Sequence, residues 1–333
     1  MRRNSESTGS SGSRRGWTVV SAVALILLLL SFDSQAAWTR VESGTMAWLR
    51  SVFFLDERSG WAVGSGGTFL ITSDGGNTWK QNGRITNDTL RDVYFFSERS
   101  GWLLCERDRY SSGKLPLSYT LRTEDGGSTW ERIDLDSAGD RLVRFMFSKD
   151  GSGLALGEGG AIWQLREDGV SWERRELPTR HLVLDGQFVA DSKSILVGGG
   201  GTVLISKGKD EWELSPQGPA AKVRLNSVFF LNGSLGWVVG TRGQIYRTVD
   251  GGRSWSSQAS GVTTTLIDVY FADHQRGFVV GDGGRIIETA NGGQTWISQM
   301  TGVRGVFERL TFVGRTGIAV GHGGLIMRYS PDQ

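Results

Sequence analysis

A short motif that recurs along the chain constrains the fold more than any other feature. It reads Thr-x-Asp-x-Gly-x-Thr-Trp, with occasional Asn for Asp and Ser for Thr, and is called the Asp box below. Clear copies end at Trp79, Trp130, Trp255 and Trp296, and degenerate copies end at Trp172 and Trp212. Successive tryptophans lie 51, 42, 40, 43 and 41 residues apart. A repeat of this length indicates an array of similar supersecondary units.

Each repeat contains segments for four short strands. An apolar run such as 49–54 comes first, a Gly-aromatic segment such as 60–64 follows, and 68–72 is typical of the third segment. The fourth segment begins at the motif tryptophan. Four short strands joined by glycine-rich hairpins make one antiparallel blade of a β-propeller. The abundance of glycine (49) over proline (5) fits many tight turns.

The two ends of the chain decide the number of blades. The last repeat, 307–329, stops without its tryptophan strand, whereas Trp38 lies 41 residues before Trp79 and is in phase with the repeat. We therefore predict an all-β fold over residues 37–330: a seven-bladed β-propeller with four-stranded antiparallel blades. The N-terminal strand joins the last blade, which closes the ring and removes exposed strand edges.

Residues 1–36 have the organisation of a secretory signal peptide. A polar, basic stretch is followed by an apolar run over 17–30 and by small residues over 34–37. We expect cleavage after Ala36 or Ala37; the alternative is an uncleaved anchor that leaves the protein tethered to the membrane. The Arg14-Arg15 pair also permits twin-arginine export. The expected location is the periplasm, or the thylakoid lumen in a photosynthetic host.

Charge and cysteine content exclude some functions. Outside residues 1–36 the basic and acidic residues balance, so a general electrostatic affinity for nucleic acid is not expected. The single cysteine, Cys105, lies in an apolar run, so it is expected to be a buried hydrophobic residue and no intramolecular disulfide is possible.

The Asp box is expected to be structural. Its Asp accepts hydrogen bonds from turn amides, its Gly supplies a positive φ, and its Trp packs between blades. One carboxylate per copy does not suit calcium, and His181, His274 and His322 lack metal-ligand spacing, so we predict neither metal nor cofactor. The predicted structural residues are Asp74, Trp79, Asp125, Trp130, Asp250, Trp255, Asn291 and Trp296.

An insertion in the second blade is the first candidate binding site. It lies between the second and third strands, over 106–116, and explains the one long tryptophan interval. In the usual blade order this connection shares a face with the loops between blades, opposite the Asp boxes. Insertions on one face of a repeat array often mark a binding surface, and the alternative is a solvated loop. The candidate partner-binding residues are Arg107, Arg109, Tyr110 and Lys114.

A second candidate site is a ring of polar residues near the central axis. The third position of every inner strand is polar: Ser51, Asp92, Arg144, Asp185, Ser227, Asp268 and Arg309. Three carboxylates and two guanidinium groups can bind a charged ligand, or they can pair with one another and with turn amides.

The sequence favours a binding protein over an enzyme. Asp-box propellers include sialidases and other glycoside hydrolases, which need paired carboxylates or a Tyr–Glu nucleophile with an arginine cluster. Neither a Phe-Arg-Ile-Pro motif nor a Gly-x-Ser-x-Gly elbow is present. We predict a non-catalytic protein; the alternative is a cell-envelope glycoside hydrolase or carbohydrate-binding propeller.

The full repeat, Leu-x-Asp-Val-x-Phe … Gly-Trp-x-Val-Gly … Thr-x-Asp-Gly-Gly-x-Thr-Trp, resembles the photosystem II stability and assembly factor family. So does the segment Ala319-Val-Gly-His-Gly-Gly-Leu-Ile-Met-Arg-Tyr329, and the likeness covers 37–330. The resemblance implies a seven-bladed propeller on the lumenal or periplasmic side of a membrane. It also implies binding to early intermediates of photosystem II assembly, including the newly made reaction-centre protein, partly through an arginine-rich surface.

On this basis we expect a monomeric scaffold or chaperone for a membrane-protein assembly intermediate. Contact with the membrane is expected only through the N-terminal segment or the partner. Two features depart from the family. The sequence shows no clear basic patch, because Arg107 and Arg109 alternate with Glu106 and Asp108, and no lipid-attachment cysteine lies near the cleavage site.

Overall fold

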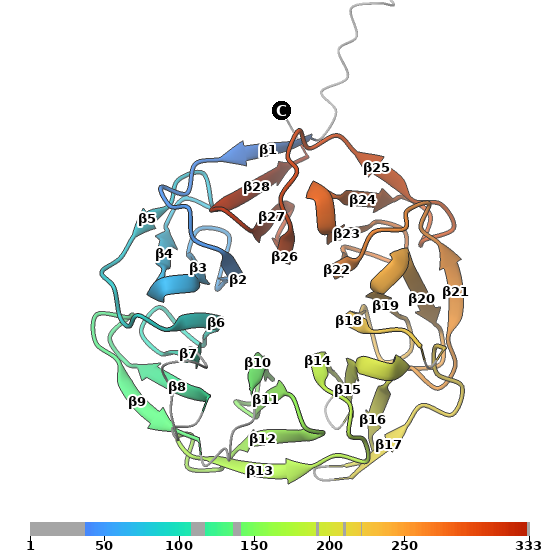
Figure 1. Ribbon diagram of the computed structural model, residues 1–333, viewed down its shortest axis with the longest axis horizontal. Helices are drawn as coiled ribbons and strands as arrows, with labels where there is room; N and C mark the ends of the chain where they lie inside the picture. The colour runs from blue at the N-terminus through green and yellow to red at the C-terminus, as the bar shows by residue number, and fades with distance from the viewer. Residues whose placement is uncertain are drawn as a thin grey trace, which may run out of the picture. The chain divides into compact units, whose positions relative to one another are not determined.

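The computed structural model describes residues 37–107, 117–135, 141–190, 193–208, 211–220 and 222–331. In these residues seven four-stranded antiparallel sheets surround a central axis (Figure 1), and Trp38–Ser330 form one compact unit. The predicted seven-bladed β-propeller is confirmed. No helix in the described residues is long and apolar enough to cross a membrane.

Every blade places its first strand at the axis and its second strand next to it. The inner strands are β2 (Leu49–Phe54), β6 (Thr89–Phe95), β10 (Leu142–Phe147), β14 (Val183–Ala190), β18 (Leu225–Phe230), β22 (Leu266–Phe271) and β26 (Phe307–Val313). The second strands are β3 (Gly60–Gly64), β7 (Gly101–Glu106), β11 (Gly153–Gly157), β15 (Lys193–Gly198), β19 (Gly236–Gly240), β23 (Gly277–Gly281) and β27 (Thr316–Gly321).

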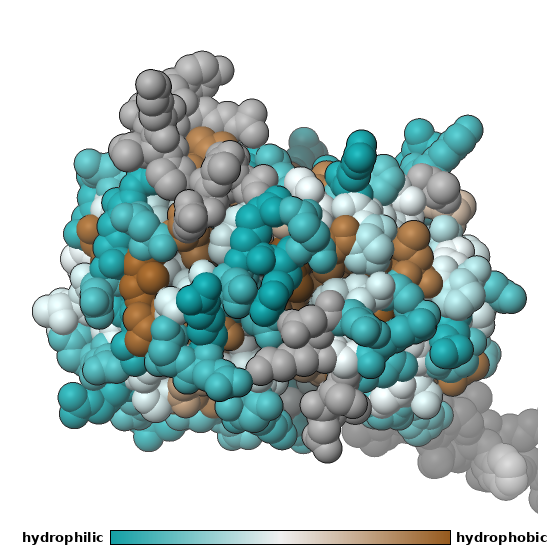
Figure 2. Space-filling view, turned by 90° about the horizontal axis from the view of Figure 1, so that it is seen from below, coloured by the Kyte–Doolittle hydropathy of each residue, from teal (hydrophilic) through white to brown (hydrophobic). Residues whose placement is uncertain are grey.

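The third and fourth strands complete each blade toward the outside. The third strands are β4 (Phe69–Thr72), β8 (Ser118–Thr123), β12 (Ala161–Leu165), β16 (Val203–Ser206), β20 (Gln244–Thr248), β24 (Ile286–Thr289) and β28 (Leu325–Ser330). The outer strands are β5 (Lys80–Gln81), β9 (Glu131–Asp134), β13 (Trp172–Glu176), β17 (Trp212–Leu214), β21 (Ser256–Ala259), β25 (Ile297–Gln299) and β1 (Ala37–Val41). Figure 2 views the ring from its edge and shows a mainly hydrophilic surface with separate hydrophobic patches.

The ring closes as predicted, because β1 is the outer strand of the blade that contains β26, β27 and β28 (Figure 1). Its Thr39 hydroxyl donates to the carbonyl of Arg328 at 3.2 Å. Trp38 is 7% exposed and contacts Tyr329 of its own blade and Phe278 of the preceding blade, with ring centroids 5.4 and 6.2 Å away. The closing strand therefore ties two blades together.

Steric fit explains the glycine that starts most second strands. A Cβ at Gly60 would lie 2.7 Å from ring atoms of Phe54, the last residue of the inner strand, and the same relation holds for Gly101 and Phe95. The phenylalanine thus covers the glycine, which no larger residue can replace without displacing the ring. The Gly-aromatic pattern is therefore a packing requirement of the first hairpin.

The core lies between neighbouring blades. One cluster combines Leu49, Leu70 and Trp79 of the first blade with Ile318 and Ile326 of the last. In another cluster Phe69 of the first blade meets Trp130 of the second at a centroid distance of 5.7 Å. Cys105 is buried in the same cluster, as predicted, and burial raises the pKa of its thiol. Each blade is thus stabilised by the next rather than by a core of its own.

The Asp box forms a closed set of hydrogen bonds within its turn. The Asp74 carboxylate accepts the Thr72 hydroxyl at 2.8 Å, the Thr78 N–H at 3.0 Å and the Thr78 hydroxyl at 2.6 Å. The Thr72 hydroxyl in turn accepts the N–H of Gly76, whose φ of +79° favours glycine. In the sixth blade Asn291 accepts the corresponding N–H of Thr295 at 2.9 Å. The motif tryptophan then enters the interface with the preceding blade.

The pKa of Asp125 makes this turn sensitive to acid. The Thr129 hydroxyl, followed by the Thr129 N–H, lowers the pKa of Asp125 from 3.8 to about 2. A depressed folded-state pKa contributes stability above the ordinary value, and the contribution is lost as the pH falls from about 4 to about 2. We expect Asp125→Asn, which introduces the amide that Asn291 carries in the sixth blade, to change the melting temperature little at neutral pH but to lessen its fall between pH 5 and pH 2.5. Thermal melts of both proteins across this range test it, and identical acid profiles would contradict it.

Two faces of the ring follow from the blade order. The loop face carries the connections between blades, at 42–48, 82–88, 177–182, 215–224, 260–265 and 300–306, and the connections between second and third strands. Four of the latter contain short 3₁₀ turns: η1 (Ser65–Gly67), η2 (Gly199–Gly201), η3 (Thr241–Gly243) and η4 (Asp282–Gly284). The opposite face carries the Asp boxes and the hairpins between first and second strands.

Candidate functional site

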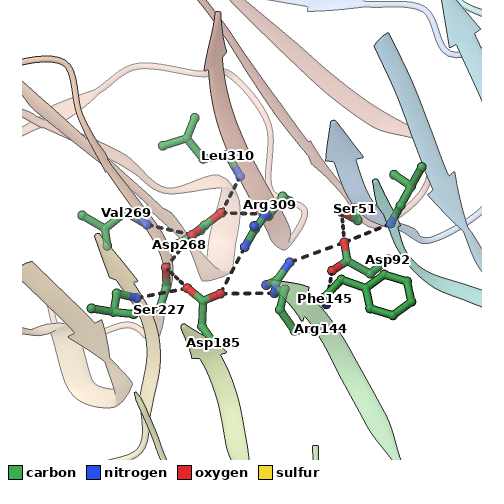
Figure 3. A network of polar contacts seen from close by, with 12 residues as sticks. Ser51, Asp92, Arg144, Phe145, Asp185, Ser227, Asp268, Val269, Arg309 and Leu310 are labelled. Carbon is green, nitrogen blue, oxygen red and sulfur yellow. Dashed lines mark hydrogen bonds and ion pairs between the residues drawn. The ribbon is translucent and has the colours of Figure 1, made fainter. Parts of the chain in front are cut away.

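The polar residues predicted from the inner strands lie around the axis (Figure 3). Asp92, Asp185 and Asp268 are 3–4% exposed, and Ser51 and Ser227 are 1% exposed. The side chains of Arg144 and Arg309 are 11% and 25% exposed to solvent. The repeat places one of these positions on each blade, so sequence periodicity alone brings the residues together.

Each ring carboxylate holds the backbone of the following blade. Asp92 on β6 accepts the N–H of Phe145 on β10 at 2.7 Å, and Asp185 on β14 accepts the N–H of Val228 on β18 at 3.1 Å. Asp268 on β22 accepts the N–H of Leu310 on β26 at 2.8 Å. The three aspartates are therefore ties between blades, made at the same position of three different repeats.

Serine hydroxyls occupy further acceptor positions of the same carboxylates. Ser51 donates to Asp92 at 2.5 Å, and Ser227 lies 2.8 Å from Asp185 and 2.6 Å from Asp268 (Figure 3). The oxygens of these carboxylates are thus occupied by hydroxyl and backbone N–H donors of the inner strands.

The two arginines link carboxylates that belong to different blades. Arg144 lies 3.3 Å from Asp185 and 4.0 Å from Asp92. Arg309 lies 3.6 Å from Asp268 of the neighbouring blade and 3.6 Å from Asp185, which belongs to a blade that is not its neighbour. Burial opposes the charge of Arg309, but Asp268, Asp185 and Asp92 together raise its pKa above the ordinary value. The guanidinium group therefore remains charged and spans the axis.

A chamber opens at each end of the axis. The one on the Asp-box face measures about 900 Å³ and is lined by Phe53, Tyr94 and Phe147, with Asp92 and Arg309 of the polar ring. Tyr94 contacts both phenylalanines, at centroid distances of 4.6 Å. The chamber on the loop face measures about 370 Å³ and includes Arg144 of the ring. The two openings therefore differ in chemistry: one is aromatic, and the other is rich in arginine.

An arginine cluster, which consists of Arg50, Arg91, Arg141 and Arg144, lies at the chamber on the loop face. Three of its members line the chamber, and Arg141 shares the partner Glu106 with Arg91. The chamber lining contains Arg50, Arg91, Arg144 and Arg224 against the acidic residues Asp282 and Glu308. The Arg50 guanidinium lies 3.7 Å from the ring centroid of Trp48, which also lines the chamber. A basic chamber with one aromatic wall suits a carboxylate-bearing polypeptide segment.

Glutamates from neighbouring elements hold the cluster in place. Glu308 lies 3.2 Å from Arg50, and Glu106 lies 3.3 Å from Arg91 and 2.7 Å from Arg141. Burial lowers the pKa of Arg91 to about 10, and the nearby guanidinium groups of Arg50 and Arg141 act in the same direction against Glu106. The positive charges are thus crowded, and an added anion relieves their repulsion.

The predicted insertion site is only partly described. Arg107 is 8% exposed, its guanidinium lies 4.8 Å from the ring centroid of Tyr119, and its N–H donates to Leu117. Arg109, Tyr110 and Lys114 lie outside the described residues. Glu106, at the start of the insertion, is the glutamate that holds Arg91 and Arg141. The insertion therefore begins at the edge of the arginine cluster.

The arginine cluster corrects the expectation that the chain has no clear basic patch. Arg50, Arg91 and Arg141 belong to three different repeats, so no local run of basic residues announces them. The sequence signal that can find them is the position just before the polar ring residue, where Arg50 and Arg91 precede Ser51 and Asp92. No group of three or more His, Cys, Asp or Glu among the described residues is placed to hold a metal ion.

These features define an Asp-box propeller whose axial carboxylates tie blades together and whose loop face opens on clustered arginines. The family model described as photosynthesis system II assembly factor YCF48 matches residues 30–139, 164–261 and 258–332. The chain belongs to this family, as its repeat pattern indicated.

Individual relatives agree with this assignment. The photosystem II assembly protein Ycf48 of Thermosynechococcus vestitus is 24% identical over 284 residues, which cover 72% of this chain and 79% of the relative. The photosystem II assembly lipoprotein Ycf48 of Trichormus variabilis is 24% identical and covers 72% of this chain and 84% of its own length. These relatives are named as assembly proteins and not as enzymes.

Solved structures share the fold. A structure of Ycf48 bound to a D1 peptide has 22% identity and a TM-score of 0.72, and the match covers 91% of this chain and all of that chain. Ycf48 from Cyanidioschyzon merolae has 21% identity and a TM-score of 0.72, over 89% of this chain and 99% of that chain. At this level of identity the likeness concerns the architecture of the propeller.

Proposed function

We propose that the protein is an exported, non-catalytic assembly factor that holds an exposed segment of a membrane-protein intermediate, of the photosystem II reaction-centre type, at its loop face. Family membership, the assembly-factor names of its relatives and the relative bound to a D1 peptide support this proposal. Export would follow from residues 1–36, and two relatives are named lipoproteins. We include Arg107, Arg109, Tyr110 and Lys114 of the insertion in the proposed surface, because Glu106, where the insertion begins, pairs with Arg91 and Arg141.

The arginine cluster is the observation that carries the proposal. Arg50, Arg91 and Arg141 lie within ion-pair distance of three glutamates, Glu308, Glu106 and Glu158. Arg50 and Arg91 line a chamber wide enough for a few side chains. An acidic or C-terminal carboxylate can replace or join these glutamates. The axial carboxylates, each tied to a backbone N–H of the next blade, act as structural groups and leave no free acid–base pair at the ring.

The test is a pull-down of the tagged protein from membranes of its own host, followed by mass spectrometry. We expect a membrane-protein intermediate to be recovered with the wild-type protein. The double variant Arg50→Gln/Arg91→Gln should weaken binding by roughly 2–4 kcal/mol, because it removes charged donors from a partly buried site. A triple variant Arg107→Ala/Arg109→Ala/Tyr110→Ala measures what the insertion adds.

The control is Arg58→Gln/Arg99→Gln, which changes two arginines in hairpins on the Asp-box face. It should recover the intermediate as well as the wild-type protein does. Equal recovery with the cluster variant would move the site away from the loop-face chamber. Recovery of no membrane protein by the wild-type protein, combined with binding on a glycan array, would replace the proposed function by carbohydrate binding.

A further inference from the structure

Among the residues that the structure describes, the exposed charge of the loop face is predominantly basic. Among the described residues of its connections, the exposed basic side chains are Arg84, Arg180, Lys222, Arg224, Arg242 and Arg304. The acidic side chains exposed in the same described connections are Glu42 and Glu158, and the Glu158 side chain keeps 40% exposure beside Arg141. The chain outside residues 1–36 is formally neutral, so this bias is a matter of placement and not of composition.

Asp282 lies in the lining of the central chamber, and, apart from Glu42, the other acidic residues described on the loop face have hydrogen-bond or ion-pair partners. Asp88 accepts the hydroxyl of Tyr119 at 2.8 Å, and Glu106 is paired with Arg91 and Arg141. Glu158 lies 3.7 Å from Arg141. Glu106 and Glu158 thus pair with arginines beside the chamber, and Asp88 pairs with a tyrosine, so none of the three lies next to the exposed basic side chains.

Two methionines on the same face are almost fully exposed. Met46 is 83% exposed and lies in the connection that follows β1, and Met300 is 97% exposed and follows β25. These connections lead into and out of the last blade, so the two side chains flank it. Exposed apolar side chains among basic ones are typical of surfaces that meet the interfacial region of a lipid bilayer.

We propose that the loop face lies flat on an anionic membrane surface, with its basic residues on lipid phosphates and Met46 and Met300 in the interfacial layer. The exposed basic residues come from five connections spread around the ring, at 82–88, 177–182, 215–224, 241–243 and 300–306. A segment held in the central chamber can reach only the innermost of them. An extended anionic plane can meet all of them at once, which favours a membrane over a single acidic peptide.

The inference goes beyond the proposed function and is compatible with it. If the loop face rests on the bilayer, the arginine cluster opens toward the membrane and meets protein segments that emerge from it. The two surfaces share a face and, apart from Arg224, which is exposed and also lines the chamber, they use different residues. The exposed arginines of the outer loop-face connections, Arg180, Arg242 and Arg304, are called the basic rim and contact lipid. Arg50 and Arg91 contact the protein segment.

The test is sedimentation of residues 37–333 with vesicles. This part contains all seven blades and the closing strand, and it lacks the apolar segment 17–30 that would insert by itself. We expect binding to vesicles that contain phosphatidylglycerol, weaker binding as the salt concentration rises, and no binding to pure phosphatidylcholine vesicles. Arg180→Gln/Arg242→Gln/Arg304→Gln should lower the partition coefficient about 100-fold, and Met46→Ser/Met300→Ser should lower it by about tenfold.

The control is Arg58→Gln/Arg99→Gln/Lys149→Gln, which removes the same charge from the opposite face and should bind as the wild-type protein does. The Arg50→Gln/Arg91→Gln variant should keep most of its vesicle binding while losing the protein partner. Membrane binding and partner binding can therefore be contradicted separately. No binding to anionic vesicles, equal binding to neutral vesicles, or an equal loss in the control would overturn the inference. A loss of the protein partner in the rim variant without any vesicle binding would assign the basic rim to protein contact instead.

Discussion

Replacing Asp185 by alanine is expected to lower the free energy of unfolding by about 3–5 kcal/mol. The carboxylate accepts the N–H of Val228 and the hydroxyl of Ser227, and it lies near the guanidinium groups of Arg144 and Arg309. Its removal leaves a buried N–H without an acceptor and two arginines beside two carboxylates in place of three. Urea unfolding of the wild-type protein and the variant, monitored by tryptophan fluorescence, measures the difference.

Two further variants separate the causes. Asp185→Asn keeps an acceptor for Val228 but removes the charge, so it should fall between the wild-type protein and Asp185→Ala. Asp134→Ala removes the surface partner of Arg132, with the side chains of Arg132 and Asp134 40% and 64% exposed, and should cost about 0–1 kcal/mol. If Asp185→Ala lowers the free energy of unfolding no more than Asp134→Ala does, the polar residues at the axis do not hold the blades together.

The architecture was predictable because the repeat encodes it more than once. The tryptophan interval gives the length of a blade, the Gly-aromatic segment gives the first hairpin, and the position of Trp38 gives the closure. The polar ring was also accessible, since Asp92, Asp185 and Asp268 occupy the same position in three repeats. That each carboxylate bonds to the next blade depends on the packing of neighbouring sheets, which no single repeat contains.

The arginine cluster and the exposed basic residues of the loop face could not be predicted from the sequence, and the physical reason is the same for both. Binding surfaces of a propeller gather side chains from several blades, so Arg50, Arg91 and Arg141 are neighbours in space but lie far apart along the chain. The exposed basic residues of the loop face are likewise not evident in a chain that is neutral overall. The excess of basic over acidic side chains becomes visible only when the described loops are assigned to one face of the propeller or the other. The insertion was easier to find, since it disturbs the regular interval, but an irregular interval does not show which residues bind.

Replacing Trp38 by alanine is expected to cost about 3–5 kcal/mol, because a large buried ring is lost at the seam of the propeller. Trp38 contacts Tyr329 and Phe312 of its own blade and Phe278 of the sixth blade. Removal of the whole strand, residues 37–41, should have a second effect that the point variant lacks. It leaves the outer edge of β28 without a partner, and an open edge can pair with other chains.

The matched control is Trp79→Ala, which removes an 8% exposed tryptophan from the first blade, where the chain itself links the outer strand to its blade. Both tryptophan variants should lose similar stability and stay monomeric in analytical ultracentrifugation. The strand deletion alone should form dimers or larger species as its concentration rises. A deletion variant that remained monomeric and as stable as Trp79→Ala would mean that packing between blades holds the propeller together without the closing strand. The position of Trp38 in phase with the repeat would then not be a requirement for folding.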